Sequence, residues 1–132
     1  MQVAVVGAGS WGTALAQSLA GAGCRVRLWA RDPAVANELR TTRRHLWALP
    51  GVELDARVDV GDHLETVLAD AEVAILAVPS HGMRDIATAV EPWARDVIMV
   101  SASKGFEMGS GLTMTAVLAD VLSGRGGGAS PR

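Results

Sequence analysis

Cysteine and lysine are nearly absent from this sequence, which contains one of each, Cys24 and Lys104. A lone cysteine can form no internal disulfide and has no second thiol at metal-ligand spacing, so we interpret Cys24 as a small residue at a helix-to-strand junction. The three histidines, His45, His63 and His81, are not spaced as in a metal site or a catalytic triad. We expect exposed or capping positions for them and no metal site.

Long apolar runs and clusters of one charge are also missing. No uninterrupted apolar stretch approaches the ~20 residues that a membrane-spanning helix needs. The first residues lack the charged and apolar regions of a secretory signal, so we expect a cytoplasmic protein without a membrane span. The 12 basic and 14 acidic residues are spread along the chain, and this balance does not favour a nucleic-acid partner. The 132 residues, 49% hydrophobic, suffice for one core of ordinary domain size.

Glycine, in contrast, is plentiful, and three glycines follow the first apolar segment at the spacing G-x-G-x-x-G. Residues 3–6 are short, apolar and rich in valine, which is typical of a strand buried on both faces. Gly7 would permit the tight turn, Gly9 would leave space for a pyrophosphate, and Gly12 would let the next helix lie close to the sheet. The phosphates would rest on unpaired N–H groups of the helix N-terminus.

The segments around these glycines favour a dinucleotide-binding turn over a glycine turn that binds nothing. Trp11, Leu15 and Leu19 follow at helical spacing and predict one apolar stripe, and residues 26–29 predict a second strand.

Strand and helix patterns then alternate along the chain. This order predicts an α/β fold with a doubly wound parallel sheet of the Rossmann type. Further strands are expected at residues 73–78 and 97–100, both buried, and helices from Asp32-Pro33 onward and at residues 64–71, 83–90 and 114–122; residues 49–51 are expected to form a turn, and Val52, Leu54 and Val58 short extended pieces.

Five short motifs occur along the chain: Gly7-Ala-Gly-Ser-Trp-Gly-Thr-Ala-Leu-Ala16, Leu28-Trp-Ala-Arg31, Leu49-Pro-Gly51, Ala77-Val-Pro-Ser80 and Ser103-Lys-Gly-Phe-Glu107. Together they resemble the NAD(P)-dependent glycerol-3-phosphate dehydrogenases, with matching order and spacing over residues 2 to about 122. In that family a doubly wound N-terminal domain binds the cofactor and a helical C-terminal domain closes the substrate site. The resemblance implies reduction of dihydroxyacetone phosphate to glycerol 3-phosphate, a phospholipid precursor.

The resemblance assigns Ser10, Trp11, Arg31 and Lys104 to cofactor contact, and Lys104 also to the substrate. Ser10 could meet a phosphate oxygen or serve as a plain helix N-cap, and the two roles are compatible. Trp11 could cover the dinucleotide or anchor the helix in the core. Arg31 follows the second strand, where an arginine favours the 2′-phosphate of NADP, while the adjacent Asp32 keeps NAD open; the alternative is a solvated surface arginine.

Lys104 lies just past the carboxyl end of a predicted strand, where a loop at the catalytic edge belongs. Its ammonium could bind the substrate's phosphate or polarise the developing oxyanion, and generic surface use is the alternative. The resemblance places the general base and a Gly-Pro-Ser/Thr segment downstream of residue 132, so we expect no catalytic base within these residues.

We therefore expect a Rossmann domain at residues 1–123 and a disordered glycine-rich tail at residues 124–132. The tail begins where a sixth strand is expected, which suggests a shortened chain with an exposed sheet edge that could form a homodimer. Two functions compete: the cofactor-binding half of an oxidoreductase, and a nucleotide-binding module without turnover. A methyltransferase is disfavoured by the Ser-Lys-Gly motif and by Arg31 in place of an acid.

Overall fold

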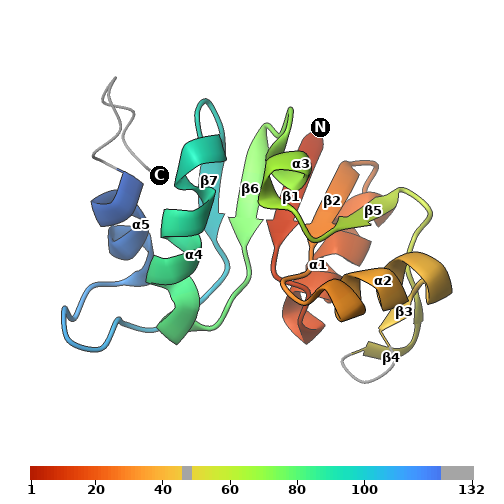
Figure 1. The fold of residues 1–132 in the computed structure, drawn as a ribbon, viewed down its shortest axis with the longest axis horizontal. Helices are drawn as coiled ribbons and strands as arrows, with labels where there is room; N and C mark the ends of the chain where they lie inside the picture. Colours follow the sequence, from red (N-terminus) through yellow and green to blue (C-terminus); the bar gives the residue numbers. More distant parts are fainter. Residues whose placement is uncertain (46–48, 123–132) are drawn as a thin grey trace.

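The computed structural model describes residues 1–45 and 49–122. Strands and helices alternate along most of the described chain, except that β3, β4 and β5 follow one another; there are two short 3₁₀ helices, η1 and η2 (Figure 1). The elements are β1 (Gln2–Val6), α1 (Ser10–Gly21), β2 (Arg25–Trp29), α2 (Pro33–Thr42), β3 (Arg44–His45), β4 (Leu49–Glu53), β5 (Val58–Gly61), α3 (Leu64–Leu68), β6 (Val73–Leu76), η1 (Ser80–Gly82), α4 (Met83–Val90), η2 (Glu91–Trp93), β7 (Ile98–Ser101) and α5 (Met114–Leu122).

Five strands form a parallel sheet in the order β5-β2-β1-β6-β7, and β3 pairs antiparallel with β4. The chain builds outward from β1 in one direction, to β2 and β5, and then returns to build β6 and β7 on the other side. The order therefore reverses beside β1, and ligands of doubly wound sheets bind at the carboxyl edge of such a reversal. The predicted fold class is confirmed.

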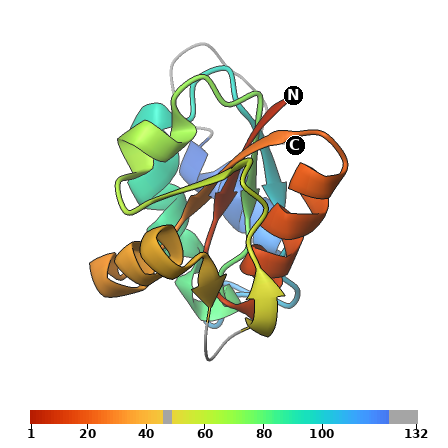
Figure 2. The ribbon, with the colours of Figure 1, turned by 90° about the vertical axis from the view of Figure 1, so that its right-hand side faces the viewer.

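Alternate side chains of β1 belong to two separate apolar clusters. Val3 and Val5 pack in the cluster that contains α1, whereas Ala4 and Val6 pack in the cluster that contains α3, α4 and α5. Figure 2 shows the same separation, with α1 on one side of the sheet and α3 and α4 on the other. Because both faces of β1 are covered, its continuous apolar sequence is the one that a central parallel strand requires.

The predicted apolar stripe of the first helix is wrong by one position. The buried residues of α1 are Gly12, Thr13, Ala16 and Ala20, whereas the side chain of Trp11 is 59% exposed. A Cβ on Gly12 would lie 1.8 Å from the carbonyl oxygen of Gly7. The helix lies so close to the strand that only small residues fit between them, and the large residues are displaced from that line.

Residues 49–51 were predicted as a turn, but they lie in β4. The strand belongs to an irregular two-stranded pair with a register shift at Arg44/His45. Such a strand tolerates Pro50, which has no N–H to donate, and Gly51 at a φ of +81°.

The strand predicted at residues 97–100 forms as β7, but the prediction that it is buried is wrong. Met99 is 3% exposed, whereas Ile98 is 54% and Val100 40% exposed. Within the described residues β7 is an edge strand, and α4 and α5 cover only the face that Met99 occupies.

Other predicted elements agree, two of them with shorter bounds. Residues 83–90 form α4, with all four predicted apolar positions buried. The helix predicted at residues 64–71 ends at Leu68, and the strand predicted at residues 73–78 ends at Leu76. Asp32 caps α2 as predicted, since its carboxylate accepts a hydrogen bond of 2.9 Å from the Ala34 amide. The predicted tail at residues 124–132 lies outside the described residues.

Candidate functional site

The glycine loop between β1 and α1 lies against both neighbouring strands. The Gly7 amide donates a 3.1 Å hydrogen bond to the carbonyl of Trp29, at the end of β2. Gly7 has a φ of +122°, and a Cβ there would lie 2.3 Å from the carbonyl oxygen of Ala77, just beyond β6. The loop is therefore closed against the sheet, and only glycine fits at its first position.

The other side of the loop is open. Gly9 is the N-cap of α1, and a Cβ built on it would meet nothing within 4 Å. No side chain caps the helix, and its first turn contains no acidic residue. Because first-turn amides have no intrahelical acceptor, they can bind an anion that approaches over Gly9. Gly9 and the first-turn amides of α1 thus form an open cradle that fits a phosphate group.

Ser10 and Trp11 lie at the mouth of this cradle, and both are exposed. The N-cap is Gly9 and Ser10 is the first helical residue, so the capping role considered for Ser10 is wrong. Core packing of Trp11 is also wrong, because the backbone contact at Gly12 turns that side chain outward. The roles of both residues in ligand contact stay predictions.

Arg31 follows β2 and is exposed. The neighbouring Asp32 carboxylate is engaged as the cap of α2, through the Ala34 amide. In the part of the chain that the structure describes, no ion pair holds the Arg31 guanidinium. The Arg31 guanidinium is thus more available to a ligand at this edge than the neighbouring Asp32 carboxylate.

Lys104 follows β7, in a loop fastened to β6 and to the segment after it. The Ala102 amide donates a 3.0 Å hydrogen bond to the Leu76 carbonyl, and the Ser103 hydroxyl donates to the Val78 carbonyl. Lys104 is exposed, and no carboxylate among residues 1–45 and 49–122 pairs with its ammonium.

The sheet places these groups along one edge. All five strands run parallel, so the glycine loop, Arg31 and Lys104 follow carboxyl ends of β1, β2 and β7. From β2 to β7 there are three strand spacings, about 14 Å in total. A ligand that touches all three groups must therefore be extended, with its middle at the glycine loop.

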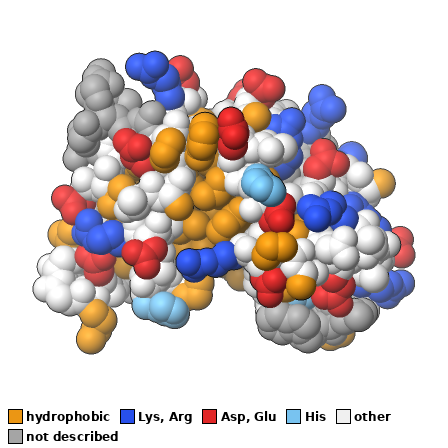
Figure 3. All heavy atoms as spheres, in the orientation of Figure 1, with side chains coloured by type: hydrophobic (Ala, Val, Ile, Leu, Met, Phe, Trp, Pro, Cys, Tyr) orange, Lys and Arg blue, Asp and Glu red, His pale blue; other side chains and the backbone are white. Residues whose placement is uncertain are grey.

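On the face that carries α4, Figure 3 shows hydrophobic side chains gathered in a hollow over the middle of the sheet.

His45 was expected in an exposed or capping position, and this prediction is wrong. The ring is 1% exposed, and its Nε2 lies 2.8 Å from the carbonyl oxygen of Ala8, inside the glycine loop. His45 thus links β3 to the phosphate cradle across 37 positions of sequence, a contact for which no spacing rule gives a signal. His63 and His81 are exposed, as predicted.

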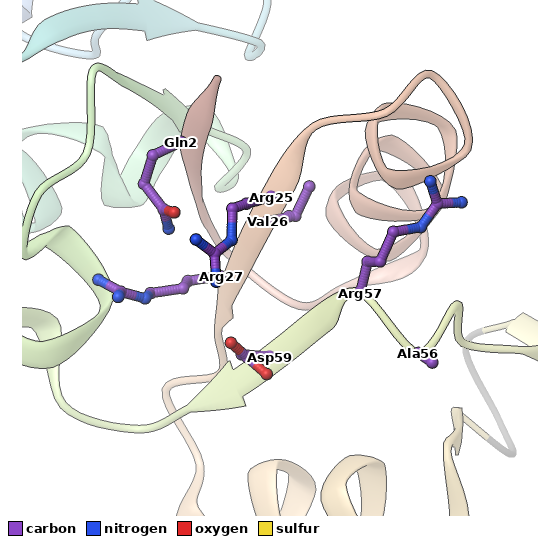
Figure 4. Close-up of a pocket in the computed structure, with 7 residues that line it drawn as sticks. All are labelled: Gln2, Arg25, Val26, Arg27, Ala56, Arg57 and Asp59. Atoms are coloured by element: carbon purple, nitrogen blue, oxygen red, sulfur yellow. The ribbon is translucent and has the colours of Figure 1, made fainter.

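Two cavities lie at the opposite edge of the sheet, where the strands begin. One of about 220 Å³ is lined by Arg25, Arg27 and Arg57, and the last two are already engaged (Figure 4). Arg27 donates to the carbonyls of Thr66 and Ala69, and Arg57 forms a 2.7 Å ion pair with Asp55. The second, about 450 Å³, is lined partly by Trp93, Arg95 and Asp96. Neither is at the carboxyl edge, so we do not assign the candidate site to them.

Two carboxylates have lowered pKa values because arginines hold their charged forms. Hydrogen bonds from Arg57 lower the pKa of Asp55 from 3.8 to about 2. Hydrogen bonds from Arg84, and then from Ser110, lower the pKa of Glu107. Each pair therefore stabilises the fold above the ordinary carboxyl pKa, and this contribution is lost as the pH falls toward the lowered value.

We accordingly expect the melting temperature of the chain to fall more between about pH 5 and about pH 3 than that of the Asp55→Asn/Glu107→Gln variant. Thermal unfolding followed by circular dichroism at both pH values measures the difference. Equal decreases in the two proteins would show that these pairs do not link protonation to stability.

No helix within the described residues is long and apolar enough to cross a membrane. The same residues contain no group of three or more His, Cys, Asp or Glu side chains arranged to hold a metal ion.

Comparison with known proteins identifies the family. The sequence model described as NAD-dependent glycerol-3-phosphate dehydrogenase N-terminus matches residues 2–127. A glycerol-3-phosphate dehydrogenase [NAD(P)+] from Syntrophobacter fumaroxidans is 41% identical over 121 residues, 91% of this chain and 36% of that protein. The Corynebacterium kroppenstedtii protein of the same name is 43% identical over 93% of this chain and 37% of its own length. The chain thus spans little more than a third of the relatives it matches.

Solved structures agree with this result. The glycerol-3-phosphate dehydrogenase of Coxiella burnetii superposes with a TM-score of 0.86 at 29% identity, over 92% of this chain and 37% of that one. A ketopantoate reductase from Ralstonia eutropha superposes at 0.66 with 21% identity, over 92% of this chain and 37% of that one, and so shares the fold alone. The chain therefore belongs to the family of NAD-dependent glycerol-3-phosphate dehydrogenases, whose N-terminal part it matches.

Proposed function

We propose that this chain binds a nicotinamide dinucleotide, NAD or NADP, at the carboxyl edge of its sheet. The observation that carries the proposal is the open N-terminus of α1, where Gly9 leaves space and no side chain caps the helix. A pyrophosphate would accept hydrogen bonds from the first-turn amides and interact favourably with the helix dipole. The proposed cofactor contacts are Gly7, Gly9, Ser10, Trp11, Gly12, Arg31 and Lys104.

The order of these groups along the edge sets the orientation of the ligand. With the pyrophosphate at the glycine loop and the adenosine ribose at Arg31, the nicotinamide extends past β1 toward β6 and β7. Lys104 follows β7 on that side, so we place its ammonium beside the position where a substrate would meet the nicotinamide.

The reaction we propose for the whole enzyme is reduction of dihydroxyacetone phosphate to glycerol 3-phosphate. The reduced cofactor would supply the hydride to the ketone carbon, and an acid elsewhere in the whole enzyme would supply the proton to its oxygen. Lys104 would hold the substrate's phosphate or stabilise the negative charge that develops on the ketone oxygen. These 132 residues would be the cofactor-binding half, with its domain at residues 1–123. The cytoplasmic location and a homodimer stay predictions.

Arg31→Ala is expected to weaken NADPH binding by about 1.5–3 kcal/mol, because the guanidinium makes charged hydrogen bonds to the 2′-phosphate. NADH, which lacks this phosphate, should bind almost as before. Titrations with both cofactors measure the two effects. Equal losses for NADH and NADPH would contradict the proposed contact.

A chimera tests the proposed reaction. Residues 1–122 of this chain, which end with α5, would replace the matching part of the Syntrophobacter fumaroxidans relative, which is 41% identical over 121 residues. We expect the chimera to oxidise NADPH when dihydroxyacetone phosphate is added. A chimera that folds and binds NADPH but has no turnover would favour a binding module without catalysis.

A further inference from the structure

The loop that contains Lys104 is long and rich in glycine. We call residues 102–113, between β7 and α5, the Lys104 loop. Its three glycines, Gly105, Gly109 and Gly111, have φ values of +101°, +92° and +72°. Glycine-rich backbone is costly to order. The Lys104 side chain has no ion pair among the described residues, so it does not order the loop itself. Contacts made by other residues must therefore hold the loop in one conformation.

One such contact comes from α4, where Arg84 binds the loop residue Glu107 with two hydrogen bonds. Arg84 Nε lies 2.7 Å from Glu107 Oε2, and a terminal nitrogen lies 3.0 Å from Oε1. The other terminal nitrogen lies 2.7 Å from the Asp120 carboxylate on α5. The Glu107 side chain is only 18% exposed. This two-pronged geometry orders a loop far better than a single exposed ion pair.

Glu107 also organises the remainder of the loop. Its carboxylate accepts a 2.5 Å hydrogen bond from the Ser110 hydroxyl. Its amide donates to the Leu112 carbonyl at 2.8 Å, and its carbonyl accepts from the Gly111 amide at 3.0 Å. Phe106 forms an isolated bridge with Thr113. Glu107 is thus the side chain through which the folded loop is joined to α4.

We propose that Arg84 and Glu107 are positioning residues that hold Lys104 at the cofactor and substrate edge. In sequence, Lys104 lies between two contacts that hold the loop: the hydrogen bond from the Ser103 hydroxyl to the Val78 carbonyl, and the Arg84–Glu107 pair. Without the second, the backbone after Ser103 is free to move Lys104 away from the edge. The inference rests on the proposed function of Lys104, and it assigns a role to two residues outside the glycine turn.

Because Lys104 is the only lysine of the chain, a lysine-specific protease reports directly on the order of this loop. Glu107→Gln removes the charge at nearly constant shape, and Asp55→Asn is the matched control. Asp55 also forms two hydrogen bonds with an arginine side chain, but it precedes β5, away from the Lys104 loop. We expect faster cleavage after Lys104 in Glu107→Gln and an unchanged rate in Asp55→Asn. An unchanged rate in Glu107→Gln would overturn the inference.

A double-variant cycle separates positioning of Lys104 from general stabilisation. NADPH binding is measured for the full chain and for its Glu107→Gln, Lys104→Met and doubly substituted variants. We expect Glu107→Gln to weaken binding about threefold to tenfold in the wild-type background and hardly at all with Lys104→Met, because coupled residues are non-additive.

Equal losses from Glu107→Gln in both backgrounds would overturn the inference, since the pair would then act without Lys104. No loss in either background would overturn it as well. Absence of NADPH binding by the folded wild-type chain would instead contradict the proposed function, so the two failures are distinguishable.

Discussion

Gly9→Val is expected to abolish binding of both NADH and NADPH while the chain keeps its fold. Gly9 has φ −76° and ψ −170°, which valine adopts readily, and nothing lies within 4 Å of its Cβ position. The new side chain would nevertheless stand over the first-turn amides of α1, where the pyrophosphate is proposed to bind. Loss of two charged hydrogen bonds, at about 1.5–3 kcal/mol each, corresponds to a weakening of roughly 100-fold or more.

Two matched glycine variants make this result specific. Gly21→Val places the same side chain at the other end of α1, again with nothing within 4 Å, and should leave cofactor binding intact. Gly12→Ala should damage the fold itself, because its Cβ would lie 1.8 Å from the Gly7 carbonyl oxygen. Isothermal titration with circular dichroism spectra compares the three. Undiminished affinity in Gly9→Val would contradict the proposed phosphate site.

A polypeptide of these 132 residues is expected to bind reduced cofactor but to turn over dihydroxyacetone phosphate negligibly. Hydride transfer needs the ketone held at reacting distance, and such positioning is worth roughly 7–11 kcal/mol of the barrier. Among the proposed site residues only Lys104 would touch the substrate. We propose that the general base and a second substrate contact come from the part of the relatives' length that this chain does not span. Without them the ketone oxygen is neither held nor protonated efficiently.

The assay follows NADPH absorbance after addition of dihydroxyacetone phosphate to the purified chain. The chimera with the remainder of the Syntrophobacter fumaroxidans relative is the positive control. Turnover by the 132 residues alone at an ordinary enzymatic rate, about 1–1000 per second, would refute the proposal that these residues bind the cofactor but do not suffice for catalysis.

The parts of the fold that could be predicted are those that depend on local pattern. Residues 3–6 give a buried strand because they are apolar without interruption, and residues 83–90 give a helix because apolar side chains recur at its period. Gly7 and Gly12 lie where the motif predicts, with the close backbone contacts that exclude a Cβ.

What could not be predicted depends on neighbours distant in sequence. The exposure of Ile98 and Val100 is set by the absence, within the described residues, of a strand beyond β7 and of cover on one face. Trp11 faces outward because the Gly7–Gly12 contact leaves no room for it. His45 meets Ala8, and Arg84 meets Glu107, across 37 and 23 positions of sequence. No periodicity within a short window encodes such pairs.

The central claim, that this chain binds a nicotinamide dinucleotide through the open N-terminus of α1, is tested most directly by titrating the purified chain with NADPH and with NADH. We expect saturable binding with one site per chain, and competition between the two cofactors for that site. A chain that is folded by circular dichroism but shows no saturable binding of either cofactor would contradict the claim.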